Sequence, residues 1–193
     1  MTAEHIERDL PNRWLARGPR HRLDAELLRD NALTIAGVLP HELGGKPAYE
    51  TRAEAFKSKG EFTWRRGIYV CQKRGDPYST YASFDVPDRF ACSVRRSHTT
   101  TPLQALSLLN EPIFIEAAMA LTKRVMQEAP NSGSNKRIAR MFEICTARMP
   151  IGSEQVTLGE LFEKSTRDGA CESDALRLVA NSLLNLDETM TKE

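Results

Sequence analysis

A run of polar residues comes directly before a sharply marked helix start. Arg95, Arg96 and His98 are followed by the hydroxyl side chains of Thr99–Thr101. Guanidinium and hydroxyl groups beside a helix N-terminus are groups that bind carboxylates or phosphates. One interpretation is therefore an anion site. The pattern favours the other, in which the two arginines pair with aspartates of the preceding loop and the threonines cap the helix.

Those aspartates are Asp85 and Asp88, which flank Pro87 in the segment FDVPD. Two carboxylates at this spacing suit general acid and base chemistry, or a site for a hard cation. A loop held by aspartate turns next to a proline explains the same residues, and we favour it.

Metal and haem ligation would require more than His98. The other histidines, His5, His21 and His41, lie far away in the sequence, and none shows ligand spacing on a helix. We therefore expect no metal and no cofactor.

The cysteines and the catalytic motifs lead to a similar expectation. Four irregularly spaced cysteines contain no C-x-x-C pair, so free thiols are expected; only Cys71 and Cys92, which flank a loop, are worth testing for a bridge. No G-x-S-x-G, H-E-x-x-H or Gly-rich phosphate loop occurs. The sequence therefore does not predict an enzyme.

The helix start itself follows every local rule. Thr101 is a good N-cap, Pro102 suits the first helical position, and Gln104 is placed to complete a capping box. The helix should end at Asn110. Its many leucines predict a central packed element, against which the next helix, beginning at Pro112, packs back.

The first predicted helix, residues 22–40, has an apolar stripe through Leu28, Ala32, Ile35 and Leu39. Its other face carries charged side chains, mostly at intervals of four. They are Arg22, Glu26, Arg29 and Asp30. Such a pattern favours a solvated ladder of ion pairs.

The remaining pattern predicts a mainly α protein of about five to six helices, with one or two short strands and a long irregular loop. Residues 40–61 are predicted to form a loop, with a possible helical turn at 53–57. In residues 62–101 we expect two short strands, near Ile68–Val70 and Phe90–Val94, joined by a long irregular loop. The helical part, 102–188, contains helices at 102–109, 112–128, 136–148, 154–165 and 174–184. We expect residues 1–193 to form a single domain.

Composition excludes several classes of protein. The 193 residues carry 27 Lys and Arg against 26 Asp and Glu, a net charge of +1, which argues against a nucleic-acid binder. No apolar run reaches the ~18 residues of a membrane span, and the polar start lacks the apolar stretch of a signal peptide.

Four segments in order resemble a known family: PNRWLARGPRHRLDAELLRD, RRGIYV, FDVPDRFACSVRRSHTTTPLQALSLLNEPIFIEAA and ANSLLNLDE. Together, over residues 11–188, they are similar to the domain of unknown function at the C-terminal end of planctomycete cytochrome-c-containing proteins. The TTTPLQALSLLNEP core is the specific part. The family-like positions are Arg22, Glu26, Arg29, Asp30, Phe84, Asp85, Pro87, Asp88, Arg95, Arg96 and Thr99–Asn110.

The resemblance implies large, exported, multidomain relatives for which no reaction is established. An earlier stretch of the family domain has no counterpart here, so this chain resembles the later part; it also lacks a haem-attachment C-x-x-C-H and an export signal. Its compartment stays open. The shared positions suggest that Arg22, Glu26 and Asp30 form a partly buried network that docks the first helix on the Arg95–Arg96 segment.

We therefore predict a non-catalytic helical interaction or scaffold domain, whose partners are other domains of a parent protein, another protein or a second copy. The alternative is a ligand-binding or hydrolytic site for an anionic or sugar-like substrate in the loop 76–101. Its residues would come from the candidate polar cluster, which is Asp85, Asp88, Arg95, Arg96, His98, Thr99, Thr101, Gln104 and Asn110. A third possibility, haem contact through His98, predicts a shift of the Soret band on mixing.

Overall fold

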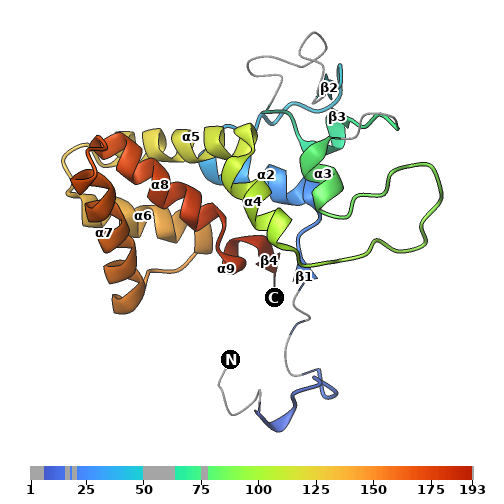
Figure 1. Cartoon of the computed structure of the whole chain (residues 1–193), viewed down its shortest axis with the longest axis horizontal. Coiled ribbons are helices and arrows are strands. Elements are labelled where there is room, and N and C mark those ends of the chain that lie inside the picture. Colours follow the sequence, from blue (N-terminus) through green and yellow to red (C-terminus); the bar gives the residue numbers. More distant parts are fainter. Residues whose placement is uncertain (1–6, 16–17, 19–20, 50–63, 75–77, 193) are drawn as a thin grey trace.

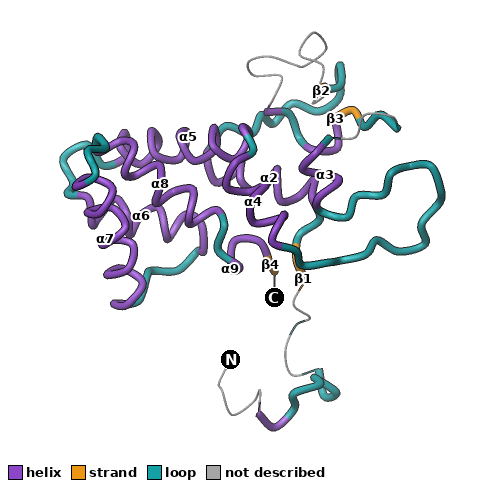
Figure 2. The backbone as a smooth tube through the Cα atoms, in the orientation of Figure 1, coloured by secondary structure: helices purple, strands orange, loops and turns teal. Residues whose placement is uncertain are grey.

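The computed structural model describes residues 7–15, 18, 21–49, 64–74 and 78–192. In this part of the chain eight α-helices dominate, with two pairs of very short strands (Figures 1 and 2). The elements are β1 His21–Arg22, α2 Ala25–Ala36, β2 Ala48–Tyr49, η3 Gly67–Tyr69 (a 3₁₀-helix), β3 Val70–Cys71, α3 Ser79–Ser83, α4 Pro102–Asn110, α5 Pro112–Glu128, α6 Ser134–Thr146, α7 Gly152–Arg167, α8 Glu172–Leu184, α9 Asp187–Met190 and β4 Thr191–Lys192. The predicted mainly α fold is confirmed.

The core is built around α5, which packs against α2 on one side and α8 on another (Figure 1). Its apolar stripe, Ile113, Ala117, Leu121 and Val125, is buried. Helices α6 and α7 cover one end of α8, and α3 and α4 lie toward the opposite end of α5. Removal of these apolar side chains from water is the main force that holds the helices together.

The first helix is shorter than predicted, since α2 spans Ala25–Ala36 and Arg22 lies in β1. At its start, β1 pairs with β4 in antiparallel register and the Leu23 N–H donates to the Met190 carbonyl. At its end, Gly37 adopts φ 76°, and its N–H donates to helix carbonyls, a geometry that glycine adopts without steric cost.

Three predictions between residues 40 and 101 were wrong, and one lies outside the described residues. Ala48–Tyr49, in the expected loop, forms β2, which pairs in parallel with β3, and the expected long irregular loop contains α3. Phe90–Val94 is not a strand, because the Asp88 carboxylate accepts the Phe90 N–H at 3.0 Å and turns the chain. The possible helical turn at 53–57 is among the residues not described.

The bounds of the later helices were predicted within a few residues. The burial of α4 was not predicted correctly. Only Gln104 and Leu108 of α4 are buried, whereas Leu103 and Leu106 are 59% and 55% exposed. The helix lies on the outside of the bundle, next to the loop 85–101 that extends away from the helices in Figure 1. The leucines of α4 indicated burial, but Leu103, Leu106 and Leu109 form an exposed apolar face.

Among the described residues, no single helix is long and apolar enough to cross a membrane. Helices α4 and α5 reach that length and hydropathy only together, and they are bent by 55° relative to one another.

Candidate functional site

Arg22 and Asp85 form the centre of the candidate polar cluster. Their Nη2 and Oδ2 atoms are 3.1 Å apart, and each side chain is only 15% exposed. Asp85 adopts φ 62°, which turns its carboxylate back toward Thr99. Thr99 donates its N–H to Oδ2 and its hydroxyl to Oδ1, both at 2.8 Å. The Arg22 guanidinium also lies over the Phe84 ring and donates to the Thr99 carbonyl.

Gln104 joins this ion pair to α3 and α4. Its Oε1 accepts from Arg22 Nη1 at 2.7 Å and from the Thr101 N–H at 3.3 Å, which is the expected capping contact. Its Nε2 donates to the Ser83 carbonyl at 3.0 Å and to the Thr99 hydroxyl at 3.4 Å. A single buried amide thus connects β1, the end of α3 and the start of α4.

A second ion pair connects α2 to the loop before α4. Both Arg96 Nη atoms donate to the Glu26 carboxylate, at 2.7 and 2.9 Å, and Asp24 lies 3.8 Å from Nη1. Burial, the largest single cause, disfavours ionised Glu26, but the hydrogen bonds and charge of Arg96 together with a backbone hydrogen bond outweigh it, so the pKa of Glu26 is lowered. Paired donors of this kind fix geometry as well as charge.

The third contact of α2 is with the segment that contains η3. Asp30 Oδ1 accepts the Gly67 N–H at 2.6 Å and lies 3.8 Å from Arg29 Nη1. Arg29 is completely buried and donates to the Arg65 carbonyl. Burial raises the pKa of Asp30 despite the Gly67 hydrogen bond.

These contacts form one set, which we call the docking network. Its members are Arg22, Glu26, Arg29, Asp30, Asp85, Arg96, Thr99 and Gln104. Sequence spacing favoured a solvated ladder, but the structure shows that Arg22, Glu26 and Asp30 each contact a different distant segment. The expected pairing of Arg95 and Arg96 with Asp85 or Asp88 was wrong, because Asp85 pairs with Arg22 and Arg96 pairs with Glu26.

The other candidate residues do not join the network. Asp88 holds its own turn, and Asn110 donates to the Leu106 carbonyl within α4. Arg95 and His98 are exposed, and neither makes a hydrogen bond or ion pair with the described part of the chain. The less favoured interpretation, an anion site before α4, stays a prediction.

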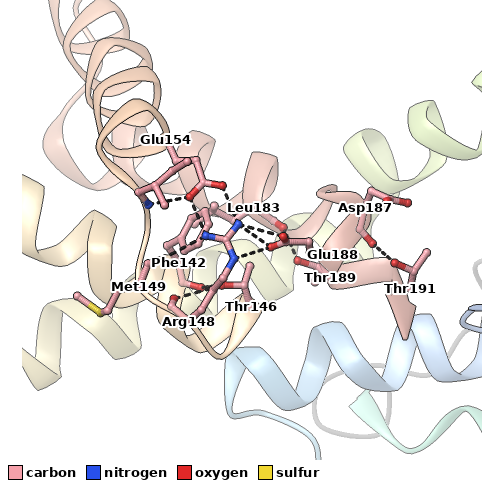
Figure 3. Close-up of polar contacts among 11 residues, drawn as sticks. Phe142, Thr146, Arg148, Met149, Glu154, Leu183, Asp187, Glu188, Thr189 and Thr191 are labelled. Carbon is pink, nitrogen blue, oxygen red and sulfur yellow. Dashed lines mark hydrogen bonds and ion pairs between the residues drawn. The ribbon is translucent and has the colours of Figure 1, made fainter. Parts of the chain in front are cut away.

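A further polar cluster, which the sequence analysis missed, connects α7 and α9 (Figure 3). Arg148 donates to Glu154 at 2.7 and 2.8 Å and to Glu188 at 2.9 and 3.0 Å, and its guanidinium lies over the Phe142 ring. Hydrogen bonds from Arg148 and from the Ile151 N–H lower the pKa of Glu154 to about 2. The only sequence signal was Glu154 in the first turn of its helix.

The thiols and carboxylates of the described residues offer little catalytic chemistry. All four cysteines are free, Cys71 and Cys92 included, and burial raises the pKa of Cys145 to about 12. Burial also opposes ionisation of Asp85, but hydrogen bonds from Thr99 and Arg22 outweigh it and lower its pKa, whereas a general base needs a pKa nearer neutrality. In the described ranges, no three His, Cys, Asp or Glu side chains could hold a metal ion.

Comparison with known families supports part of the resemblance. A family model described as PSD1, protein of unknown function (DUF1553), matches residues 1–162. Neither curated proteins nor solved structures gave a match. The matched range includes the whole docking network but ends before α8, so the ANSLLNLDE segment lies outside it. Association with planctomycetes and with cytochrome c stays a prediction.

Proposed function

The chain belongs to the PSD1 family of proteins of unknown function (DUF1553), and we propose that it is a non-catalytic helical interaction domain. The observation that carries this proposal is the internal use of the docking network. Arg22, Asp85, Arg96 and Glu26 bind one another and the backbone of neighbouring segments, so they hold the fold together.

The binding face we propose is the exposed side of α4. Leu103, Leu106 and Leu109 stay open to solvent at one edge of the bundle, while Gln104 and Leu108 on the other side anchor the helix. Contiguous apolar side chains on a soluble domain commonly mark a protein contact. Following the resemblance, the partner is another domain of a larger cytochrome-c-associated protein.

Alanine substitutions separate a structural network from a ligand site. We expect Asp85→Ala and Arg96→Ala each to lower the free energy of unfolding, by about 2 kcal/mol for Asp85, because buried polar partners lose their hydrogen bonds. Arg95→Ala, an exposed neighbour, should change it by less than about 0.5 kcal/mol. Urea denaturation measures all three variants.

The opposite result would support the rival function. If Asp85→Ala and Arg96→Ala unfold like the native chain but abolish binding of phosphate or a sugar acid, the loop 76–101 is a ligand site. A Leu103→Gln, Leu106→Gln double variant tests the α4 face. It should keep the native unfolding free energy and lose binding to the separately expressed neighbouring domain.

A further inference from the structure

A groove of about 590 Å³ lies between α5 and α8, and none of its lining residues belongs to α4 or to the docking network. Its apolar lining comes from Trp64, Met119, Ala120 and Met126. Volumes of about 300–1,000 Å³ are typical of small-molecule sites. Unbranched methionine side chains adapt to different apolar ligands.

Most of the residues that line the groove lie on α5. Its lining residues on this helix extend from Glu116 to Gln127, a distance of about 16 Å at 1.5 Å per residue. Trp64 closes one side, because its Nε1 donates to Glu116 Oε2 at 3.1 Å. The groove therefore has room for an extended apolar chain.

Each carboxylate of the groove already accepts at least one hydrogen bond, whereas its two cationic side chains keep unused donors. Glu116 already accepts from Trp64, and Asp174 accepts from Cys171 Sγ at 3.1 Å and Arg177 Nε at 3.5 Å. The Lys123 ammonium makes no hydrogen bond or ion pair with the described residues, and Arg177 uses only Nε in the contacts above. The free groups match an anion.

We infer that this groove binds an anionic amphiphile, a small molecule with an apolar chain and an acidic head group. The chain lies on Met119, Ala120 and Met126, and the head group meets Lys123 and Arg177. A protein partner fits less well, because eleven residues line the groove, whereas a stable protein interface uses about 20–30 residues a side.

Fluorescence of Trp64 provides a direct test. The chain has two tryptophans, so a Trp14→Phe background leaves Trp64 as the only reporter; Trp14 is exposed and does not line the groove. We expect dodecanoate, titrated below its micelle concentration, to give a saturable emission change. Dodecyltrimethylammonium should bind about tenfold more weakly, the difference that one or two partly exposed ion pairs supply.

Two further variants test the chain and head contacts separately. Ala120→Phe fills the groove and should abolish the dodecanoate response. Lys123→Glu with Arg177→Glu should remove the preference for the anionic head, whereas Lys136→Glu, on exposed α6 surface, should keep it. Thermal unfolding of each variant verifies that it is folded.

Three outcomes would overturn the inference: no saturable response to dodecanoate, equal affinity for both head groups, or an undiminished response in folded Ala120→Phe. A response to an acidic amphipathic helical peptide, with none to dodecanoate, would instead assign the groove to a partner helix. None of these results depends on the α4 face, so they leave the proposed function untouched.

Discussion

At the residue scale, the docking network gives similar side chains different electrostatic roles. Glu26 and Asp30 lie one turn apart on α2 and are both partly buried. Arg96 donates two hydrogen bonds to Glu26, and the pKa of Glu26 is lowered. Asp30 accepts one short bond from the Gly67 N–H, and burial raises its pKa. What Asp30 contributes is therefore an acceptor more than a charge.

This difference predicts a small change in unfolding free energy for one substitution at Asp30 and a large loss for another. Asp30→Asn keeps an oxygen for the Gly67 N–H and removes a poorly solvated charge, so it should change the unfolding free energy by less than about 1 kcal/mol. Asp30→Lys removes the acceptor and places a cation beside buried Arg29, which should cost about 3–5 kcal/mol. Urea denaturation with Glu160→Lys, on exposed α7 surface, as control measures both. A loss below about 0.5 kcal/mol for Asp30→Lys would identify Asp30 as an ordinary surface residue.

At the scale of elements, local signals predicted helices well and their surroundings poorly. Thr101, Pro102 and Gln104 marked the start of α4, because capping is decided by residues near in sequence. Burial of α4 was mispredicted, since leucine content cannot indicate which neighbouring element is present. The end of α2 at Gly37 had a local signal, a glycine before Pro40, that the apolar stripe through Leu39 obscured.

The contact between η3 and α2 depends on a missing side chain. A Cβ placed on Gly67 would lie 2.8 Å from the Glu26 carbonyl oxygen and 2.8 Å from the Tyr81 hydroxyl. Gly67→Ala should therefore push η3 from α2 and cost about 1–3 kcal/mol, the usual effect of overpacking.

Gly159→Ala is the matched control, because the nearest neighbour of its new Cβ, Asn135 Oδ1, is at an ordinary 3.7 Å. In the middle of α7 an alanine should stabilise the chain by about 0.5–1 kcal/mol. Thermal and urea unfolding compare the two variants. Equal effects of the two substitutions would contradict the close packing at Gly67.

At the scale of the whole molecule, the fold is closed by contacts between distant segments. β1 pairs with β4, the Asn31 side chain donates to the Thr189 carbonyl, and Arg148 holds Glu188. Two-residue strands and ion pairs forty positions apart leave no periodic pattern, so none of these contacts could be predicted from the sequence. The docking network was predicted only in part, from a resemblance and not from spacing.

The carboxylates of these contacts make stability depend on pH in a definite direction. Glu26 and Glu154 have lowered pKa values, so their contribution to stability is complete above the ordinary value of 4.5 and is lost as pH falls, to about 2 for Glu154. The pKa of Asp30 is shifted in the opposite direction. Its pKa is raised above 3.8, so its protonation favours the folded state as pH falls from that raised pKa to 3.8, and this offsets part of the loss.

We expect the unfolding free energy to fall between pH 4.5 and pH 2, since the lowered groups outnumber Asp30. Urea denaturation at several pH values measures the decline. The difference between the native chain and Glu154→Gln should narrow toward pH 2, because the native carboxylate then becomes neutral as well. In Asp30→Asn the decline should be steeper above pH 3.8, where protonation of Asp30 offsets part of the loss in the native chain. A constant difference between the native chain and Glu154→Gln across this range would show that Arg148 does not hold Glu154 as a carboxylate in solution.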